Sequence, residues 1–222
     1  MNHVLAILIL TLLATPFVSL TASAHSAAEH AQHEQTPIKP AMVAQENTVV
    51  QLADVQLTDQ NGKGINLKRD LVSDRIVVMG FIYTSCTTVC PVVSSIMARV
   101  HKQLGDKVGR EVQIVSITVD PQRDNPQRLL SYASKFQAGP GWSWLTGSQQ
   151  AINDTLKGLG TWTPDPQNHP PLILVGDGRS NHWTRFYGFA DPAQLIERVE
   201  QLRADRVSKP VKNGVYVMGE QP

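Results

Sequence analysis

The sequence RIVVMGFIYTSCTTVCPVV, residues 75–93, decides the fold. Residues 75–83 form a continuous apolar run rich in β-branched side chains, which is typical of a strand buried on both faces. Over residues 90–104 the apolar positions recur at the spacing of one helix face. Cys86 and Cys90, the two cysteines of the chain, therefore lie in the loop and the first helical turn that follow a buried strand.

Strands and helices alternate through the rest of the folded part. We predict an N-terminal hairpin around the turn at residues 59–64, a second buried strand at 111–119 and a short antiparallel pair at 172–175 and 182–187. The sequence predicts further helices at residues 126–136, 149–159 and 192–204. This order predicts an α/β fold whose central sheet is mostly parallel, with an antiparallel edge and flanking helices.

The first 24 residues carry no Asp, Glu, Lys or Arg. An apolar run, a break at Pro16 and the small residues at 22–24 predict a secretory signal peptide that is cleaved after Ala24. The alternative is an uncleaved membrane anchor, although about 20 apolar residues are needed to span a bilayer. Both alternatives place the domain in an oxidising, periplasmic or otherwise extracytoplasmic compartment.

Residues 25–48 show no periodic spacing of apolar side chains, which predicts a flexible tail. This segment holds His25, His30 and His33, which leaves open whether it is a solvated tether or a loose scavenger of Cu(II) or Zn(II). We expect the folded domain at residues 49–207 and a C-terminal tail at 208–222. A net charge of +1 gives no field that would favour nucleic acid as a partner.

The cysteine pair has the character of a reactive site. A cysteine at a helix N-terminus is stabilised as the thiolate, the form that attacks disulfides and binds soft metals. A disulfide closing so short a loop would stabilise the fold by only about 2 kcal/mol, which argues against a purely structural bridge. Two thiolates alone allow either dithiol–disulfide cycling or binding of Cu(I), which also accepts an imidazole ligand.

Four segments of the sequence together resemble the Sco/SenC family. They are FIYTSCTTVCP at residues 81–91, ITVDPQRD at 117–124, WLTG at 144–147 and NHPP at 168–171. The resemblance covers residues 49–204. It implies a thioredoxin-like fold and a copper-binding protein, a metallochaperone rather than an enzyme, that delivers copper to the binuclear copper centre of cytochrome c oxidase.

The resemblance also implies the site residues and partners. Cys86, Cys90 and His169 match the family's copper ligands, for Cu(I) and in another state Cu(II). Asp120 is expected close behind them because it follows a predicted central strand. The implied partners are a copper-accepting subunit of a membrane oxidase or another copper chaperone, together with a thiol reductant. Some family members act mainly as thiol–disulfide reductants, so an oxidoreductase that uses Cys86 and Cys90 stays an alternative.

The loop between the cysteines departs from the family pattern. Many members carry a proline and an acidic residue there, whereas this chain has Thr87, Thr88 and Val89. The ligands are retained, but the missing negative charge leaves metal affinity and choice of partner open.

Overall fold

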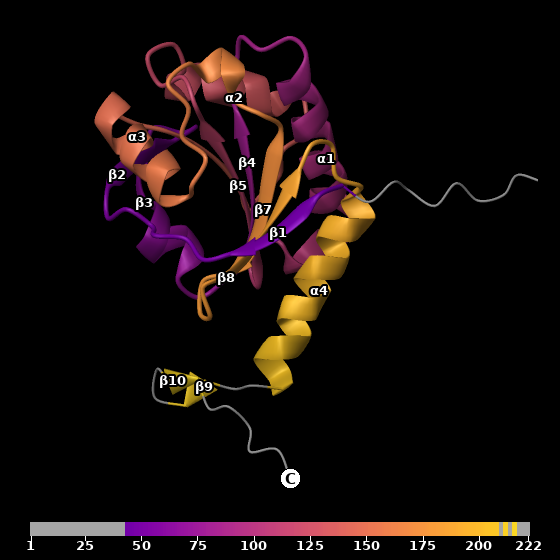
Figure 1. Cartoon of the computed structure of the whole chain (residues 1–222). Helices are drawn as coiled ribbons and strands as arrows, with labels where there is room; N and C mark the ends of the chain where they lie inside the picture. The colour runs from indigo at the N-terminus through magenta and orange to yellow at the C-terminus, as the bar shows by residue number, and fades with distance from the viewer. Residues whose placement is uncertain (1–42, 209–210, 213–214, 217–222) are drawn as a thin grey trace, which may run out of the picture. The chain divides into compact units, whose positions relative to one another are not determined.

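The computed structural model describes residues 43–208, 211–212 and 215–216. An eight-stranded sheet in the order β1-β8-β7-β4-β5-β6-β2-β3 runs through this part of the chain (Figure 1). Its strands are β1 (Gln45–Thr48), β2 (Gln56–Asp59), β3 (Gly64–Asn66), β4 (Ile76–Ile82), β5 (Val112–Thr118), β6 (Trp142–Thr146), β7 (Leu172–Asp177) and β8 (His182–Tyr187).

The sheet is mixed, which confirms the predicted fold class, but the expectation that it is mostly parallel is wrong. Strands β4, β5 and β6 pair in parallel. Every other pairing in this sheet is antiparallel. The helices α1 (Val89–Leu104) and α2 (Pro126–Ser134) supply the crossovers that parallel pairs require, whereas hairpins and loops deliver the outer strands.

Two hydrophobic cores lie on opposite faces of the sheet. Every residue of β4 is buried, and its alternate side chains enter the two cores in turn. Helices α1, α2 and α4 (Pro192–Ser208) pack on one face. Helix α3 (Gln149–Gly158) and the π-helical turn Leu67–Val72 pack on the other, and Figure 1 shows α3 on the opposite side from α1 and α4.

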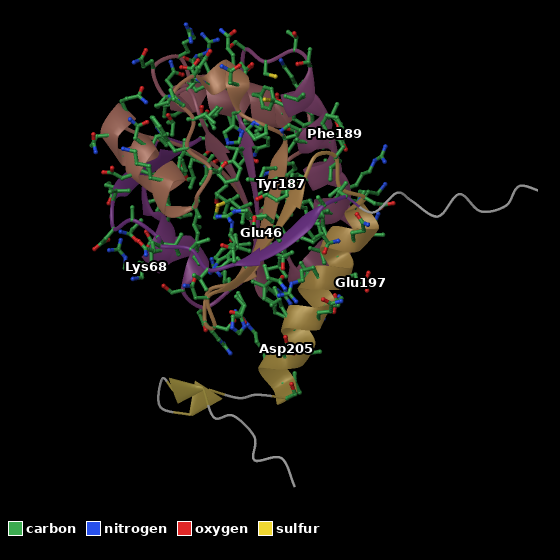
Figure 2. The ribbon with its side chains drawn as sticks, viewed as in Figure 1. Glu46, Lys68, Tyr187, Phe189, Glu197 and Asp205 are labelled. Atoms are coloured by element: carbon green, nitrogen blue, oxygen red, sulfur yellow. The ribbon has the colours of Figure 1, made fainter. Side chains whose placement is uncertain are left out.

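The eight-stranded sheet contains two strands that the sequence patterns did not predict. Strand β1 falls at the end of the predicted flexible segment 25–48, so that prediction is wrong for Gln45–Thr48, while residues 25–42 lie outside the described residues. Its mostly exposed polar side chains show no hydrophobic pattern. The strand is held instead by backbone pairing with β8 and by the hydrogen bond that the Tyr187 hydroxyl donates to Glu46; Figure 2 labels these two residues. Strand β6 extends the parallel sheet beyond β5.

The remaining elements are short. Helical turns of the 3₁₀ type occur at Gly105–Lys107 and Pro166–Asn168. Part of the predicted C-terminal tail, β9 (Val211–Lys212) and β10 (Val215–Tyr216), forms a two-stranded antiparallel pair. The predicted signal segment, residues 1–24, lies outside the described residues.

The buried carboxylate of Asp124 joins the ends of the parallel strands. One of its oxygens accepts hydrogen bonds from the Thr84 backbone amide at 2.9 Å and from the Thr118 hydroxyl at 2.6 Å. The other accepts from the Thr84 hydroxyl at 2.5 Å. The Thr146 hydroxyl donates to the Asp124 backbone carbonyl at 2.6 Å. Asp124 therefore fixes the start of the loop that carries Cys86 relative to the ends of β5 and β6.

Replacing Asp124 with alanine will destabilise the fold, because the amide and hydroxyl of half-buried Thr84 and the hydroxyl of buried Thr118 lose a charged acceptor. We expect the free energy of unfolding of Asp124→Ala to fall by about 3 kcal/mol in urea titrations followed by tryptophan fluorescence. Asp154→Ala is the matched control, since half-buried Asp154 accepts only one bond, from the Gln150 side chain within α3. Its loss should stay below about 0.5 kcal/mol. Equal losses in the two variants would contradict the role given to Asp124.

Candidate functional site

The two cysteines meet where β4 passes into α1. Cys86 lies in the loop after the strand, and its backbone amide donates to the Tyr83 carbonyl at 3.1 Å. Cys90 occupies the first turn of α1, and its amide donates to the Cys86 sulfur at 3.4 Å. Both side chains are buried free thiols. An amide that has no partner within its own 16-residue helix thus donates to the Cys86 sulfur.

The surroundings of Cys86 favour its thiolate. Burial alone would raise the pKa of this thiol. Hydrogen bonds from the backbone amides of Cys90 and Thr88 and from the side chains of Cys90 and Tyr83 outweigh burial and lower the pKa to about 7. A large fraction of Cys86 is therefore ionised at neutral pH, as nucleophilic and metal-binding cysteines require.

Cys90 has the opposite character. Burial is the largest effect and raises the pKa of Cys90 to about 12, and the adjacent negative charge on Cys86 acts in the same direction. Burial and the contact with Cys86 also raise the pKa of Tyr83 to about 12, so its hydroxyl remains a donor. The pair therefore consists of one sulfur prepared as a thiolate and one retained as a thiol that can donate to it.

His169 follows the 3₁₀ turn Pro166–Asn168 and precedes β7. Its Nε2 atom lies 2.7 Å from the Thr161 hydroxyl oxygen, and both residues are buried. The ring of Phe81 packs against the imidazole with the ring centroids 5.3 Å apart. Burial lowers the pKa of His169 to about 4, so the imidazole is neutral at physiological pH.

A cavity of about 10 Å³ lies between Cys90 and His169. This volume corresponds to about one water molecule. The cavity is walled by the end of β4, the start of α1 and the segment before β7: Phe81, Ile82, Tyr83, Val89, Cys90, Val93, Val119, His169, Pro170 and Pro171. Across the described ranges, no three His, Cys, Asp or Glu side chains converge closely enough to hold a metal ion. The structure thus brings the cysteines together and places His169 in the lining of the same small cavity as Cys90.

Asp120 lies at the end of β5, as its place in the sequence indicates, but it does not line this cavity. Its side chain is buried and pairs with the Arg123 guanidinium at 2.8 Å. The neighbouring Asp124 is the carboxylate whose charge acts on Cys90. The proposed place of Asp120 behind the ligands stays a prediction.

Sequence reasoning missed several groups that shape the site. Tyr83 donates to Cys86, Asp124 anchors the loop, and Thr161 engages His169. Asp124 could have been predicted from the DPQRD segment at residues 120–124, because this segment places two carboxylates directly after a central strand. Thr161 carried no signal, since its contact with His169 depends on where helix α3 ends.

The chain is similar to known proteins over most of the described part. A model of the SCO1/SenC family matches residues 44–204, more than half of the chain. The SCO1 protein homolog of Bacillus subtilis is 32% identical over 162 residues, which are 70% of this chain and 79% of that protein. The chain spans about half, 52%, of the length of another curated relative, from Stutzerimonas stutzeri.

Solved structures show the same architecture. A SCO1/SenC family lipoprotein of Bacillus anthracis superposes with a TM-score of 0.59 at 26% identity, covering 71% of this chain and 98% of that one. ScoI of Bradyrhizobium japonicum, solved with copper bound, gives a TM-score of 0.54 at 25% identity, covering 69% and 99%. Within the described part of the present chain, none of the helices combines the length and apolar character needed to cross a membrane.

The difference between the two thiols predicts their reactivity. In the reduced protein, alkylation of Cys86 by iodoacetamide should accelerate with a midpoint near pH 7, because the thiolate is the reactive form. Cys90 should remain largely unmodified up to pH 9, since its pKa is raised to about 12. Peptide mass spectrometry over a pH series measures both rates. Cys90→Ala removes one side-chain donor to Cys86 and should move the midpoint upward. A midpoint near pH 8.5, the ordinary value of a free thiol, in both proteins would contradict this assignment.

Proposed function

Because the chain belongs to the SCO1/SenC family, we propose that it binds Cu(I) as cargo through Cys86 and Cys90, with His169 as third ligand, and passes the ion to a copper-accepting partner. The observation that carries the proposal is the pair of adjacent sulfurs at the start of α1, one of them with its pKa lowered to about 7. Thiolate sulfur is the donor that Cu(I) prefers.

The donor set suits a copper ion. A neutral imidazole has a lone pair to offer, and His169 lines the same cavity as Cys90. The cavity has about the volume of one water molecule, which suffices for a single ion. The similarity to the copper-bound ScoI of Bradyrhizobium japonicum supports the same choice of metal.

Transfer requires that a partner reach the ion. The loop residues Ser85, Thr87 and Thr88 are exposed, whereas the sulfurs beneath them are buried. A partner that contacts this uncharged loop could replace the ligands one at a time. We propose an extracytoplasmic recipient, such as the copper-accepting subunit of a cytochrome c oxidase or another copper chaperone, and the lipoprotein relative from Bacillus anthracis supports a place near a membrane.

A copper titration of the reduced protein tests this proposal. We expect one Cu(I) per chain in competition with a chromogenic Cu(I) chelator. Cys86→Ser and Cys90→Ser should abolish tight binding, and His169→Ala should weaken it by more than about tenfold, equivalent to about 1.4 kcal/mol. His101→Ala is the control, because His101 lies towards the far end of α1 and should leave the affinity unchanged. Wild-type affinity in the two cysteine variants would refute the proposal.

The asymmetry of the thiols favours one alternative, a thiol–disulfide oxidoreductase. In this reaction the Cys86 thiolate attacks a partner disulfide and forms a mixed disulfide, and one partner sulfur leaves as a thiolate. The Cys90 thiol then loses its proton and attacks Cys86, which releases the second partner thiolate. The partner is reduced, and the two cysteines end as a disulfide that an external thiol reductant must restore.

Trapping of the mixed disulfide tests this alternative. Cys90→Ser should accumulate an adduct through Cys86 when it is mixed with a disulfide-containing peptide, because the resolving thiol is absent. Cys86→Ser should form at least about tenfold less adduct at pH 7, since the pKa of Cys90 is raised to about 12. Non-reducing gels and mass spectrometry measure the adducts. Equal adduct formation by the two variants would exclude Cys86 as the attacking group.

A further inference from the structure

The hydrogen bond between Thr161 and His169 is built into two rigid turns. On the Thr161 side, helix α3 ends in a Schellman motif: the Thr161 amide donates to the Leu156 carbonyl at 2.9 Å and the Gly160 amide to the Lys157 carbonyl at 2.9 Å. Gly160 adopts φ +67°, the left-handed conformation that this motif requires. A side chain at this position would also strike the Arg185 guanidinium. The end of α3 therefore fixes where the Thr161 hydroxyl lies.

On the other side, a capped turn holds His169. The Asp165 carboxylate accepts from the Gln167 amide at 2.9 Å, and the His169 amide donates to the Pro166 carbonyl at 3.2 Å. Phe81 packs on the imidazole from β4. The 2.7 Å contact between Nε2 and the Thr161 hydroxyl is thus a defined bond between two buried, positioned groups.

We propose that Thr161 is a latch residue, which holds His169 Nε2 in the metal-free protein and must release it before that nitrogen can bind copper. The inference rests on the proposed function, because it concerns the third ligand of the same site. It explains why His169 shares a cavity with Cys90 although the described side chains form no assembled metal centre. The ion first meets the two sulfurs, and the imidazole joins by exchanging its bond to Thr161 for a bond to the metal.

The latch lowers the affinity of the third ligand. The free energy that copper binding gains from Nε2 is reduced by the free energy of the hydrogen bond that is broken. Copper is therefore released more easily than it would be if the imidazole had no such bond. A net contribution typical of one hydrogen bond corresponds to an affinity change of about 2- to 10-fold. The arrangement suits a protein that must give its cargo away.

Two substitutions at one position test the latch. Thr161→Val keeps the shape of the side chain and removes the hydroxyl, whereas Thr161→Ser keeps the hydroxyl. We expect Thr161→Val to bind Cu(I) about 2- to 10-fold more tightly than wild type, and Thr161→Ser to match wild type. An unchanged or weakened affinity in Thr161→Val would overturn the proposal; weaker binding would instead identify Thr161 as a residue that orients the ligand.

A measurement on the metal-free protein supports the affinity data. Long-range ¹H–¹⁵N spectra of the imidazoles should show a hydrogen-bonded Nε2 for His169 in wild type and Thr161→Ser, and the loss of that bond in Thr161→Val. Addition of Cu(I) to wild type should shift the Nε2 resonance. A shift confined to Nδ1, with the Thr161 bond retained, would overturn the latch.

The two proposals fail in different ways. If wild type binds no Cu(I), the proposed function and the latch both fall. If wild type binds Cu(I) through the cysteines and His169→Ala binds as well as wild type, the cysteine site stands and the latch falls.

Discussion

The loop that carries the cysteines depends on one buried carboxylate. Asp124 accepts hydrogen bonds from the ends of β4 and β5, and its backbone carbonyl accepts one from the end of β6. A charged group with so little exposure must have its oxygens satisfied by donors, and here these donors come from Thr84, just after β4, and from Thr118 at the end of β5. The stability of the carboxyl edge of the sheet and the position of Cys86 therefore rest on the same contacts.

The thiols of Cys86 and Cys90 differ in pKa because the two residues lie at different places along the chain. Cys86 lies just before helix α1, where helix amides and a tyrosine hydroxyl point at its sulfur. Cys90 lies one turn further, where burial dominates and few donors reach it. A spacing of three residues between the cysteines places them on either side of the helix start, so one helix terminus produces both environments.

The patterns in the sequence were sufficient for the longer elements that bury side chains on a regular period, but not for β6, whose five residues are too few to show one. Strand β4 and helix α1 follow from their apolar positions, and the cysteine loop between them follows from those two elements. Strand β1 escaped prediction because its side chains are exposed and its stability lies in backbone pairing with β8. The bond between Thr161 and His169 escaped because it joins the end of α3 to the turn before β7, a tertiary contact with no local signature.

The guanidinium of Arg185 connects the end of α3, next to Thr161, with strand β1 at the edge of the sheet. It donates to the Thr48 hydroxyl of β1 at 3.2 Å and to the Leu159 carbonyl at 3.0 Å, one residue before Gly160. A displacement of β1 would therefore be passed on to the turn that carries Thr161 through the two hydrogen bonds of Arg185. Since β1 is the first element of the described chain, a change in how it pairs with β8 would also alter the position of the turn that carries Thr161.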